Sequence, residues 1–266
     1  MRRHFHKMHG LGNDFVIIDA RKEPFEVTAA LARAIADRRT GIGCDQLIVL
    51  QPSESADLRM RIWNSDGGEV QSCGNATRCV ILLTGVQSIE SDGGILEGEN
   101  LGVEVEVSLG EPRFGWNEVP LAYPMDTNEL PMAWDDLEHP QALSVGNPHV
   151  VFFVDDLEAV PMEYVGPVIE HDAAFPERIN VNVAQVEDGD VRLRTWERGA
   201  GLTLACGTGA CATAIAAIKT RRAESPVRVT MPGGCLIVAW APGEPVRMRG
   251  GAVHVFEGEL DLEALQ

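Results

Sequence analysis

The chain has 266 residues, a length that allows two domains with a core each, and a formal net charge of −18 at pH 7. Its acidic composition argues against binding to nucleic acid or to an anionic membrane, because both attract basic surfaces. No apolar run reaches the roughly 18 residues of a membrane-spanning helix, and the N-terminus, MRRHFHKMHG, has no apolar signal core. We therefore expect a cytoplasmic protein whose six cysteines stay reduced.

The first half of the chain predicts a loop followed by strands and helices. A loop at residues 8–14 precedes a buried strand at 15–19, and a helix follows from Thr28, a suitable N-cap, to Asp37. The later elements are strands at 46–51, 58–63 and 101–108 and a helix at about 74–83 that ends at Gly85.

The second half repeats this pattern after a proline-rich crossover at residues 110–140. Its predicted elements are strands at 150–154, 179–186 and 191–196, a long Ala-rich helix at about 207–219, and hairpins turning at Gly233-Gly234 and Pro242-Gly243. Strand-rich halves with one long helix each indicate an α/β protein of the α+β type. We place its two duplicated domains at residues 1–115 and 116–266.

An internal sequence repeat supports the duplication. Half the chain length separates Cys73 from Cys206, and LRMRIW, from Leu58, is echoed by VRLRTW, from Val191. The residues that recur at this offset are Arg59, Arg61, Trp63, Gly68, Cys73 and Gly74, which reappear as Arg192, Arg194, Trp196, Gly201, Cys206 and Gly207. An earlier echo, one residue longer in offset, pairs Gly12-Asn13 with Gly146-Asn147.

Each of the two matched cysteines precedes a glycine and the predicted start of a helix. A helix N-terminus carries unpaired N–H groups and partial positive charge, so it stabilises a thiolate and binds a carboxylate. We expect the pKa of such a thiol to fall below its usual value of about 8.5. If the two helix ends face each other, one thiolate removes the α-proton of an amino acid while the opposite thiol returns one, which inverts the stereocentre.

The remaining cysteines and the N-terminal histidines lack such support. Cys79 and Cys211 do not occupy equivalent positions, and no CxxC or other zinc-site spacing occurs. The histidines His4, His6 and His9 imitate a metal cluster but are expected in a frayed terminus. No metal site is therefore predicted. The alternative for Cys73 and Cys206 themselves is an inert place in the core, which is common for cysteine.

Five separated motifs resemble the diaminopimelate epimerase family: KMHGLGNDF, TGIGCDQL, WNSDGGEVQSCGNATRC, GNPH and WERGAGLTLACGTGACA. The resemblance implies two similar domains, each a curved mixed sheet around a long central helix, with the active site in the cleft between them. It implies that the last ~10 residues join the first domain. It also implies a homodimer that needs neither metal nor pyridoxal phosphate.

The resemblance carries roles onto individual residues. Cys73 and Cys206 match the two catalytic positions, one acid and one base. The backbone donors to the reacting α-carboxylate match Gly74, Asn75, Gly207 and Thr208. The other substrate contacts match Asn13, Gln46, Asn64, Asn147, Asn182, Glu197 and Arg198. His149 and Glu197 match residues that adjust the protonation of the thiols.

The chain departs from the family pattern as we know it at a few positions near these motifs. Ala76 replaces a glycine, Leu202 stands where an acidic residue is frequent, and Trp63-Asn64-Ser65 stands for Phe-Asn-Ala. None of these changes removes a catalytic or carboxylate-binding atom. They bear on the shape of the distal pocket, and therefore on the substrate.

The leading hypothesis is an isomerase that interconverts LL- and meso-2,6-diaminopimelate for lysine and peptidoglycan precursor synthesis. Related alternatives are racemases of other amino acids on the same scaffold. A different class is a dithiol redox protein that uses Cys73 and Cys206 as a switch, and a third is a noncatalytic amino-acid-binding module. Incorporation of deuterium at the substrate α-carbon separates the first two from the others.

Overall fold

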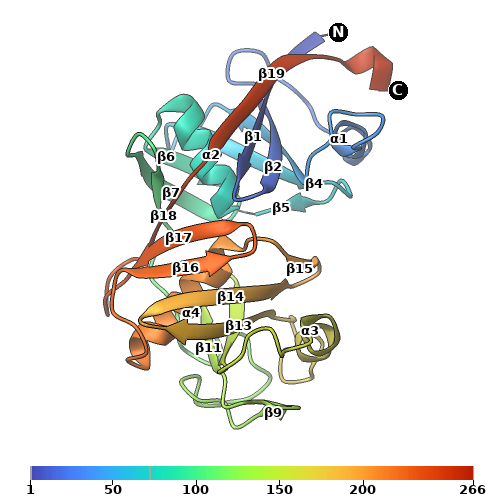
Figure 1. Ribbon diagram of the computed structural model, residues 1–266. Coiled ribbons are helices and arrows are strands. Elements are labelled where there is room, and N and C mark those ends of the chain that lie inside the picture. The colour runs from blue at the N-terminus through green and yellow to red at the C-terminus, as the bar shows by residue number, and fades with distance from the viewer. Residues whose placement is uncertain (1, 72, 266) are drawn as a thin grey trace. The chain divides into compact units, whose positions relative to one another are not determined.

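The computed structural model describes residues 2–71 and 73–265, and the chain divides into two compact units (Figure 1). The first unit runs to Val107 and regains the chain from Gly250 onward, while the second comprises Ser108–Arg249. Residues 108–115, which the sequence assigned to the first half, cluster with the second unit. Among the described residues, no helix is both long and apolar enough to cross a membrane.

The first unit is a mixed sheet with two helices. Its elements are β1 (Arg2–Gly10), β2 (Asn13–Asp19), α1 (Ala29–Ala36), β3 (Gln46–Gln51), β4 (Leu58–Asn64), β5 (Glu69–Val70), α2 (Gly74–Thr84), β6 (Ser88–Ser91), β7 (Gly94–Asn100), β8 (Val105–Ser108) at its boundary, β19 (Val253–Asp261) and the short 3₁₀ helix η1 (Leu262–Leu265). Strands β1–β2, β3–β4, β4–β5 and β6–β7 pair antiparallel, while β2–β3 and β4–β6 pair parallel.

The second unit has the same plan. Its elements are β9 (Ala133–Trp134), β10 (Leu137–Glu138), β11 (Gln141–Ser144), β12 (Pro148–Phe153), α3 (Met162–Glu170), β13 (Asn180–Glu187), β14 (Asp190–Glu197), β15 (Gly201–Thr203), α4 (Gly207–Lys219), β16 (Val227–Met231), β17 (Gly234–Ala239) and β18 (Arg247–Gly250). Strands β11–β12, β13–β14, β14–β15 and β16–β17 pair antiparallel, while β12–β13 and β14–β16 pair parallel.

The two units therefore repeat one order of strand pairings, and even the register agrees. In the parallel pair β2–β3, Phe15 lies opposite Gln46. In the parallel pair β12–β13, His149 lies opposite Asn180, so the two pairs are related by one common sequence offset. The predicted duplicated α+β fold is confirmed. Local chemistry explains the helix bounds: Thr28 caps α1 by accepting the N–H of Leu31, and α2 ends where Gly85 takes a left-handed φ of 71°.

One long helix lies against the sheet of each unit. Helix α2 contacts β1, β2, β7 and β19, and α4 contacts strands from β11 to β17, so each sheet curves about its helix. Helix α4 is apolar or small on all sides, GTGACATAIAAIK, and ten of its residues are buried, as expected for a helix enclosed by sheet. The closed packing fixes the position of the first turn of each helix, where the matched cysteines stand.

Two local predictions are wrong, and β1 is the more instructive. Residues 2–10 were expected to be a frayed end and a loop, but they form a strand that pairs with β2 and with β19 from the far end of the chain. Figure 1 shows β19, in red, beside β1, in blue. Strand β7 and helix α3 were not predicted, and the strand expected at 101–108 begins only at Val105. Pairing with a distant partner, rather than local apolar alternation, makes β1 a strand.

Candidate active site

Cys73 stands at the N-cap of α2, in an extended conformation, with its side chain partly exposed. Its Sγ lies 3.8 Å from Oδ1 of Asn13, which also accepts a hydrogen bond of 3.3 Å from Nδ2 of Asn75. The Asn13 amide is held in this orientation because its Nδ2 donates to Asp45 at 3.0 Å. The structure therefore brings Cys73, Asn13 and Asn75 together at the start of α2.

The start of α2 is held by a buried arginine and by close packing against β1. Arg78 is fully buried and its Nη2 donates to Oδ1 of Asn75 at 2.7 Å. A Cβ on Gly10 would meet Nη2 of Arg78 at 3.2 Å and Cβ of Asn75 at 3.3 Å, so a side chain here would require these neighbours to shift by a few tenths of an ångström. The Cys73 end of α2 is thus fixed by the sheet behind it.

An ion cluster holds the turn that carries Asn13. The carboxylate of Asp14 accepts from Nζ of Lys7, from both terminal nitrogens of Arg38, and from the backbone N–H of Asp45. Burial opposes ionisation, but the hydrogen bonds from Arg38 and Lys7 outweigh it and hold the pKa of Asp14 well below its usual range. Asp14 therefore stays charged and keeps the neighbouring Asn13 in place.

Gln46 and Asn64 form a second polar pair in the first unit. They lie opposite each other on β3 and β4, and Nε2 of Gln46 donates to Oδ1 of Asn64 at 2.8 Å. Oε1 of Gln46 is buried and has no hydrogen-bond partner among the described residues. A buried carbonyl oxygen without a partner is costly, so this atom is suited to accept a hydrogen bond from a ligand.

Cys206 stands at the N-cap of α4 and is 4% exposed. Its Sγ accepts from the N–H of Gly209 at 3.4 Å and lies 3.5 Å from Oγ1 of Thr208. Burial, and then the charge of Glu197, raise the pKa of Cys206 well above its usual value, although the donors Thr208 and Gly209 act in the opposite direction. The lowered pKa predicted from the helix end is therefore wrong for Cys206, because desolvation outweighs the helix end.

Glu197 is the partner of this thiol. It is the last residue of β14, its Oε1 accepts from Oγ1 of Thr203 at 2.6 Å, and its charge acts on the Cys206 thiol. Burial raises the pKa of Glu197 as well, while the polar contacts with Thr203 and Cys206 lower it. Thiol and carboxyl thus share one buried environment, in which a proton on the sulfur is favoured.

His149 begins a chain of hydrogen bonds that ends at Cys206. The residue is fully buried, and burial together with the nearby charge of Arg198 lowers its pKa to about 3, so the ring is neutral. Its Nδ1 lies 3.1 Å from Nδ2 of Asn182, an amide nitrogen that also donates to the carbonyl of Val150. Because Asn182 donates to Nδ1, the ring carries its hydrogen on Nε2.

The rest of the chain follows in one direction. Nε2 of His149 donates to Oδ1 of Asn147 at 2.9 Å, and Nδ2 of Asn147 donates to Oγ1 of Thr208 at 3.3 Å. The Thr208 hydroxyl, having accepted from Asn147, is free to donate to Sγ of Cys206. Each donor in the chain points towards the sulfur, so His149 acts on Cys206 through Asn147 and Thr208.

Asn180 is a polar residue of this region that the sequence reasoning missed. It occupies on β13 the place that Gln46 occupies on β3, and its Oδ1 accepts the backbone N–H of Arg198 at 3.0 Å. The predicted residue Asn182 lies deeper, with no exposed surface, and its Oδ1 accepts from Thr195 at 3.1 Å. The signal was present: the offset that pairs Asn13 with Asn147 also pairs Gln46 with Asn180.

The guanidinium of Arg198 remains open to a ligand. Arg198 is exposed, and its Nη1 donates to the carbonyl of Glu177 at 3.0 Å. That contact, together with the backbone bond to Asn180, fixes the base of the side chain near the end of β14. A guanidinium held in this way is suited to bind a carboxylate with two parallel hydrogen bonds.

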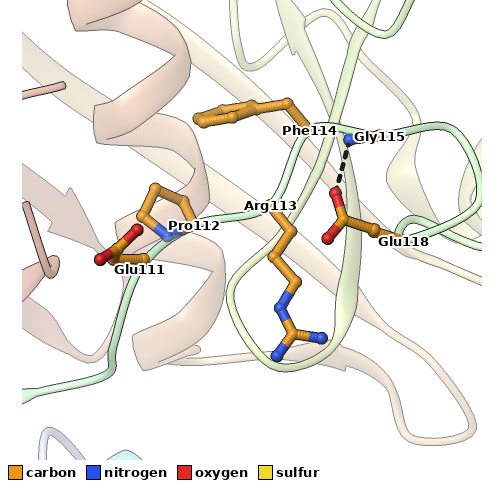
Figure 2. Close-up of a pocket in the computed structure, with 6 residues that line it drawn as sticks. All are labelled: Glu111, Pro112, Arg113, Phe114, Gly115 and Glu118. Carbon is orange, nitrogen blue, oxygen red and sulfur yellow. Dashed lines mark hydrogen bonds between the residues drawn. The ribbon is translucent and has the colours of Figure 1, made fainter. Parts of the chain in front are cut away.

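A hollow of about 680 Å³ lies elsewhere in the second unit, in the segment that precedes β9 (Figure 2). Figure 2 shows the carboxylate of Glu118 accepting the N–H of Gly115, with Arg113 extending away from it. The residues that line the hollow are Glu111, Pro112, Arg113, Phe114, Gly115 and Glu118. None of the predicted site residues is among them, so this hollow is not the candidate active site.

Comparison with known proteins identifies the family. The model of the diaminopimelate epimerase family matches residues 5–114 and 141–255. A diaminopimelate epimerase of Rhizorhabdus wittichii is 62% identical to the chain, covering 99% of the chain and 97% of the relative. One from Sphingopyxis alaskensis is 59% identical, covering 98% of each.

Solved structures of lower identity share the fold. A phenazine biosynthesis protein of the PhzF family from Bacillus anthracis matches with a TM-score of 0.69 and 18% identity, covering 98% of the chain and 99% of the neighbour. A hydroxyproline epimerase from Agrobacterium vitis matches with a TM-score of 0.65 and 15% identity, covering 97% of the chain and 91% of the neighbour. Given the family match over both units and the full-length relatives, the chain belongs to the diaminopimelate epimerase family, and it is an isomerase.

Proposed function

We propose that Cys73 and Cys206 are the two catalytic groups with which this diaminopimelate epimerase interconverts LL- and meso-2,6-diaminopimelate. The observation that carries the proposal is the matched place of the two thiols. Each is the N-cap of the long helix in one of two units that share one order of strand pairings. A duplicated thiol at a duplicated helix end suits inversion of a stereocentre, which needs one group to remove a proton and another to deliver one.

The proposed chemistry is a proton exchange at the α-carbon. One cysteine, as thiolate, removes the α-proton, and the other, as thiol, delivers a proton to the opposite face. The negative charge that develops spreads into the α-carboxylate, where the N–H groups of Gly74, Asn75, Gly207 and Thr208 act as fixed donors. Atoms and electrons balance without a redox change, since one thiol is consumed as another is formed.

We infer which thiol carries the proton before reaction. Cys206 is buried beside Glu197, and burial together with the charge of Glu197 disfavours its thiolate, so Cys206 rests as the acid. Cys73, partly exposed at the start of α2, is then the base in that direction of reaction. After one turnover the roles have exchanged, and the hydrogen-bond chain through Thr208 supports the thiolate that Cys206 has become.

Diaminopimelate carries a second amino-acid head, and we propose residues that bind it. The unpartnered Oε1 of Gln46 suits the distal ammonium, while the exposed guanidinium of Arg198 suits the distal carboxylate. Asn64 orients Gln46, and Asn180 orients Arg198. Asn182, predicted as a substrate contact, is proposed instead to position His149 and the first turn of α4.

Three further expectations remain proposals. We propose that the two compact units are the two epimerase halves, with the C-terminal segment completing the first. We also propose a homodimer, on the basis of the family resemblance. We propose a cytoplasmic location, because the family acts in amino-acid biosynthesis. Light scattering of the purified enzyme tests the first of these two, and cell fractionation with antibody detection tests the second.

Exchange in heavy water tests the proposed chemistry. Incubation with LL-diaminopimelate should yield deuterium at one α-carbon together with the meso isomer, detected by mass spectrometry. Cys73→Ala and Cys206→Ala should each abolish inversion, and Cys235→Ala, a partly exposed cysteine outside the site, serves as the matched control. Inversion at the parental rate in either catalytic variant would refute the two-thiol mechanism. Faster reaction with a single-headed amino acid would refute only the assigned substrate.

A further inference from the structure

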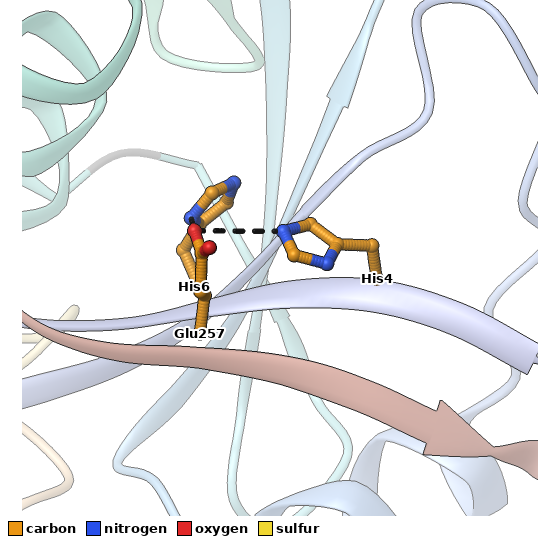
Figure 3. A group of neighbouring side chains, drawn as sticks. All are labelled: His4, His6 and Glu257. Atoms are coloured by element: carbon orange, nitrogen blue, oxygen red, sulfur yellow. Dashed lines mark ion pairs between the residues drawn. The ribbon is translucent and has the colours of Figure 1, made fainter.

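Two histidines and a glutamate gather where the first and last strands of the chain pair (Figure 3), and a third histidine lies against them. His4 and His6 are two residues apart on β1, so their side chains share one face of the strand. Glu257 on β19 lies opposite His6 in the strand register. His254 stands beside a bulge in this pairing, which brings its ring towards His6. Figure 3 shows the carboxylate of Glu257 between the two rings of β1.

The donor atoms of this cluster have the spacing of a coordination sphere. Nδ1 of His6 lies 3.1 Å from Nε2 of His254 and 3.5 Å from Oε2 of Glu257. The same Oε2 lies 3.8 Å from Nε2 of His4. Donors around a tetrahedral Zn²⁺ with bonds of about 2.0–2.1 Å lie roughly 3.4 Å apart. The three separations bracket that value, and the donor atoms of His4, His6 and Glu257 all lie within 4.8 Å of one another. His254 touches this group through His6, so a rotation of its side chain would be needed to add the fourth donor.

We propose that His4, His6, His254 and Glu257 bind one divalent transition-metal ion, of which Zn²⁺ is the type, and that this ion fastens β1 to β19. Three imidazole nitrogens and one carboxylate oxygen are a donor set that suits Zn²⁺, Cu²⁺ and Ni²⁺. Mg²⁺ and Ca²⁺ require oxygen donors, so the same cluster discriminates against them. The site takes no part in the proposed epimerisation.

An ion can reach the cluster from solvent. The side chain of His6 is 18% exposed, but those of His4 and Glu257 are 54% and 59% exposed. An ion from solvent therefore meets the outer ligands first and then the inner ring.

Binding would connect strands from opposite ends of the chain, because His6 and His254 are 248 positions apart. An ion that binds only the paired strands stabilises the folded unit by mass action. Strand β1 ends at Gly10, against which Asn75 of α2 packs. The ion thus reinforces the sheet behind the candidate active site without touching it.

Zinc titration of the full chain tests the proposal. Thiols also bind zinc, so the parent for this experiment is the Cys73→Ser/Cys206→Ser enzyme, dialysed against a chelator and then freed of it. Calorimetry should show one saturable Zn²⁺ site per chain, and Mg²⁺ should not compete. His6→Ala and His254→Ala should each weaken the affinity at least about tenfold, since each removes a metal ligand.

Controls separate a metal site from a general effect of substitution. His171→Ala removes an exposed histidine of the second unit and should leave the Zn²⁺ affinity unchanged. Glu257→Gln alters a ligand that is 59% exposed, so its weaker binding would not reflect misfolding. In the parent, added Zn²⁺ should slow amide hydrogen exchange in residues 2–10 and raise the melting temperature. Absence of saturable binding, or parental affinity in His6→Ala or Glu257→Gln, would overturn the proposal.

Discussion

Glu197 and Cys206 are neighbours, and burial raises the pKa of both. The charge of the carboxylate disfavours a thiolate beside it. This pair, rather than the end of α4 alone, decides which form of Cys206 is present before reaction.

Replacing Glu197 by glutamine should lower the pKa of Cys206, because the charge that disfavours its thiolate is gone while the polar contact with the side chain can remain. The rate at which iodoacetamide alkylates Cys206 should therefore rise at lower pH than in the parent, as followed by peptide mass spectrometry. Epimerisation should slow by on the order of 100-fold, since the acid and base are no longer matched. An unchanged alkylation profile would contradict the role given to Glu197.

The stability of the enzyme in acid should depend on His149. Its pKa is about 3 in the folded protein and 6.5 in an unperturbed chain. Well above pH 6.5 the ring is therefore neutral in both states, and its titration does not change the free energy of unfolding. As the pH falls from 6.5 towards 3, only the unfolded chain takes up the proton, and stability is lost. Between pH 7 and 4.5 this loss is about 3 kcal/mol by proton linkage.

His149→Gln removes that linked proton while keeping a polar group of similar reach. Urea unfolding at the two pH values should therefore show a smaller difference for the variant than for the parent. Other acidic groups titrate in both proteins and cancel in the comparison. Equal pH dependence of the two unfolding free energies would show that the ring is not held neutral by its surroundings.

Gly209→Ala should destabilise the enzyme, although glycine to alanine inside an open helix stabilises by about 1 kcal/mol. A Cβ at this position would lie 2.6 Å from Oδ1 of Asn182 and 2.9 Å from Oγ1 of Thr195. Both atoms belong to buried residues that cannot move freely, so we expect a loss of about 1–3 kcal/mol in chemical unfolding.

The Asn182→Ala/Gly209→Ala double variant is the check on this cause. Asn182→Ala alone should cost about 1–3 kcal/mol, because it leaves buried partners unpaired. If the new methyl group clashes with the amide, the double variant loses less than the sum of the single losses. Simple additivity would place the strain elsewhere.

Asp14→Asn should destabilise the first unit by about 3 kcal/mol, because it leaves Lys7 buried without its counter-charge. Asp14 is 15% exposed in its side chain. Its lowered pKa means that the stabilisation is present above pH 3.8 and is lost on acidification.

The matched control is Asp19→Asn on the same strand. The Asp19 side chain is 40% exposed, and its only ion pair among the described residues is with nearby Arg21, so its loss should cost less than about 1 kcal/mol. Urea unfolding at pH 7 measures both variants. Equal losses would mean that burial of the Asp14 cluster contributes little.

The sequence determined the duplication, the family and the two helices that begin at Cys73 and Cys206. These features depend on residues close together in sequence or on the repeat itself. Apolar periodicity marks the helices, Gly85 ends one of them, and the repeat sets the offset between the thiols. The offset also contained the place of Asn180, which the motif comparison passed over.

The tertiary structure decided everything that depends on partners distant in sequence. Strand β1 exists because β19 pairs with it, and the pKa of Cys206 is raised because packing removes water and brings Glu197 near. A helix end predicts a stabilised thiolate, but only burial tells how much solvation that thiolate loses. Local sequence fixes which groups are present, whereas the folded chain fixes their solvation and their neighbours, and these set the chemistry.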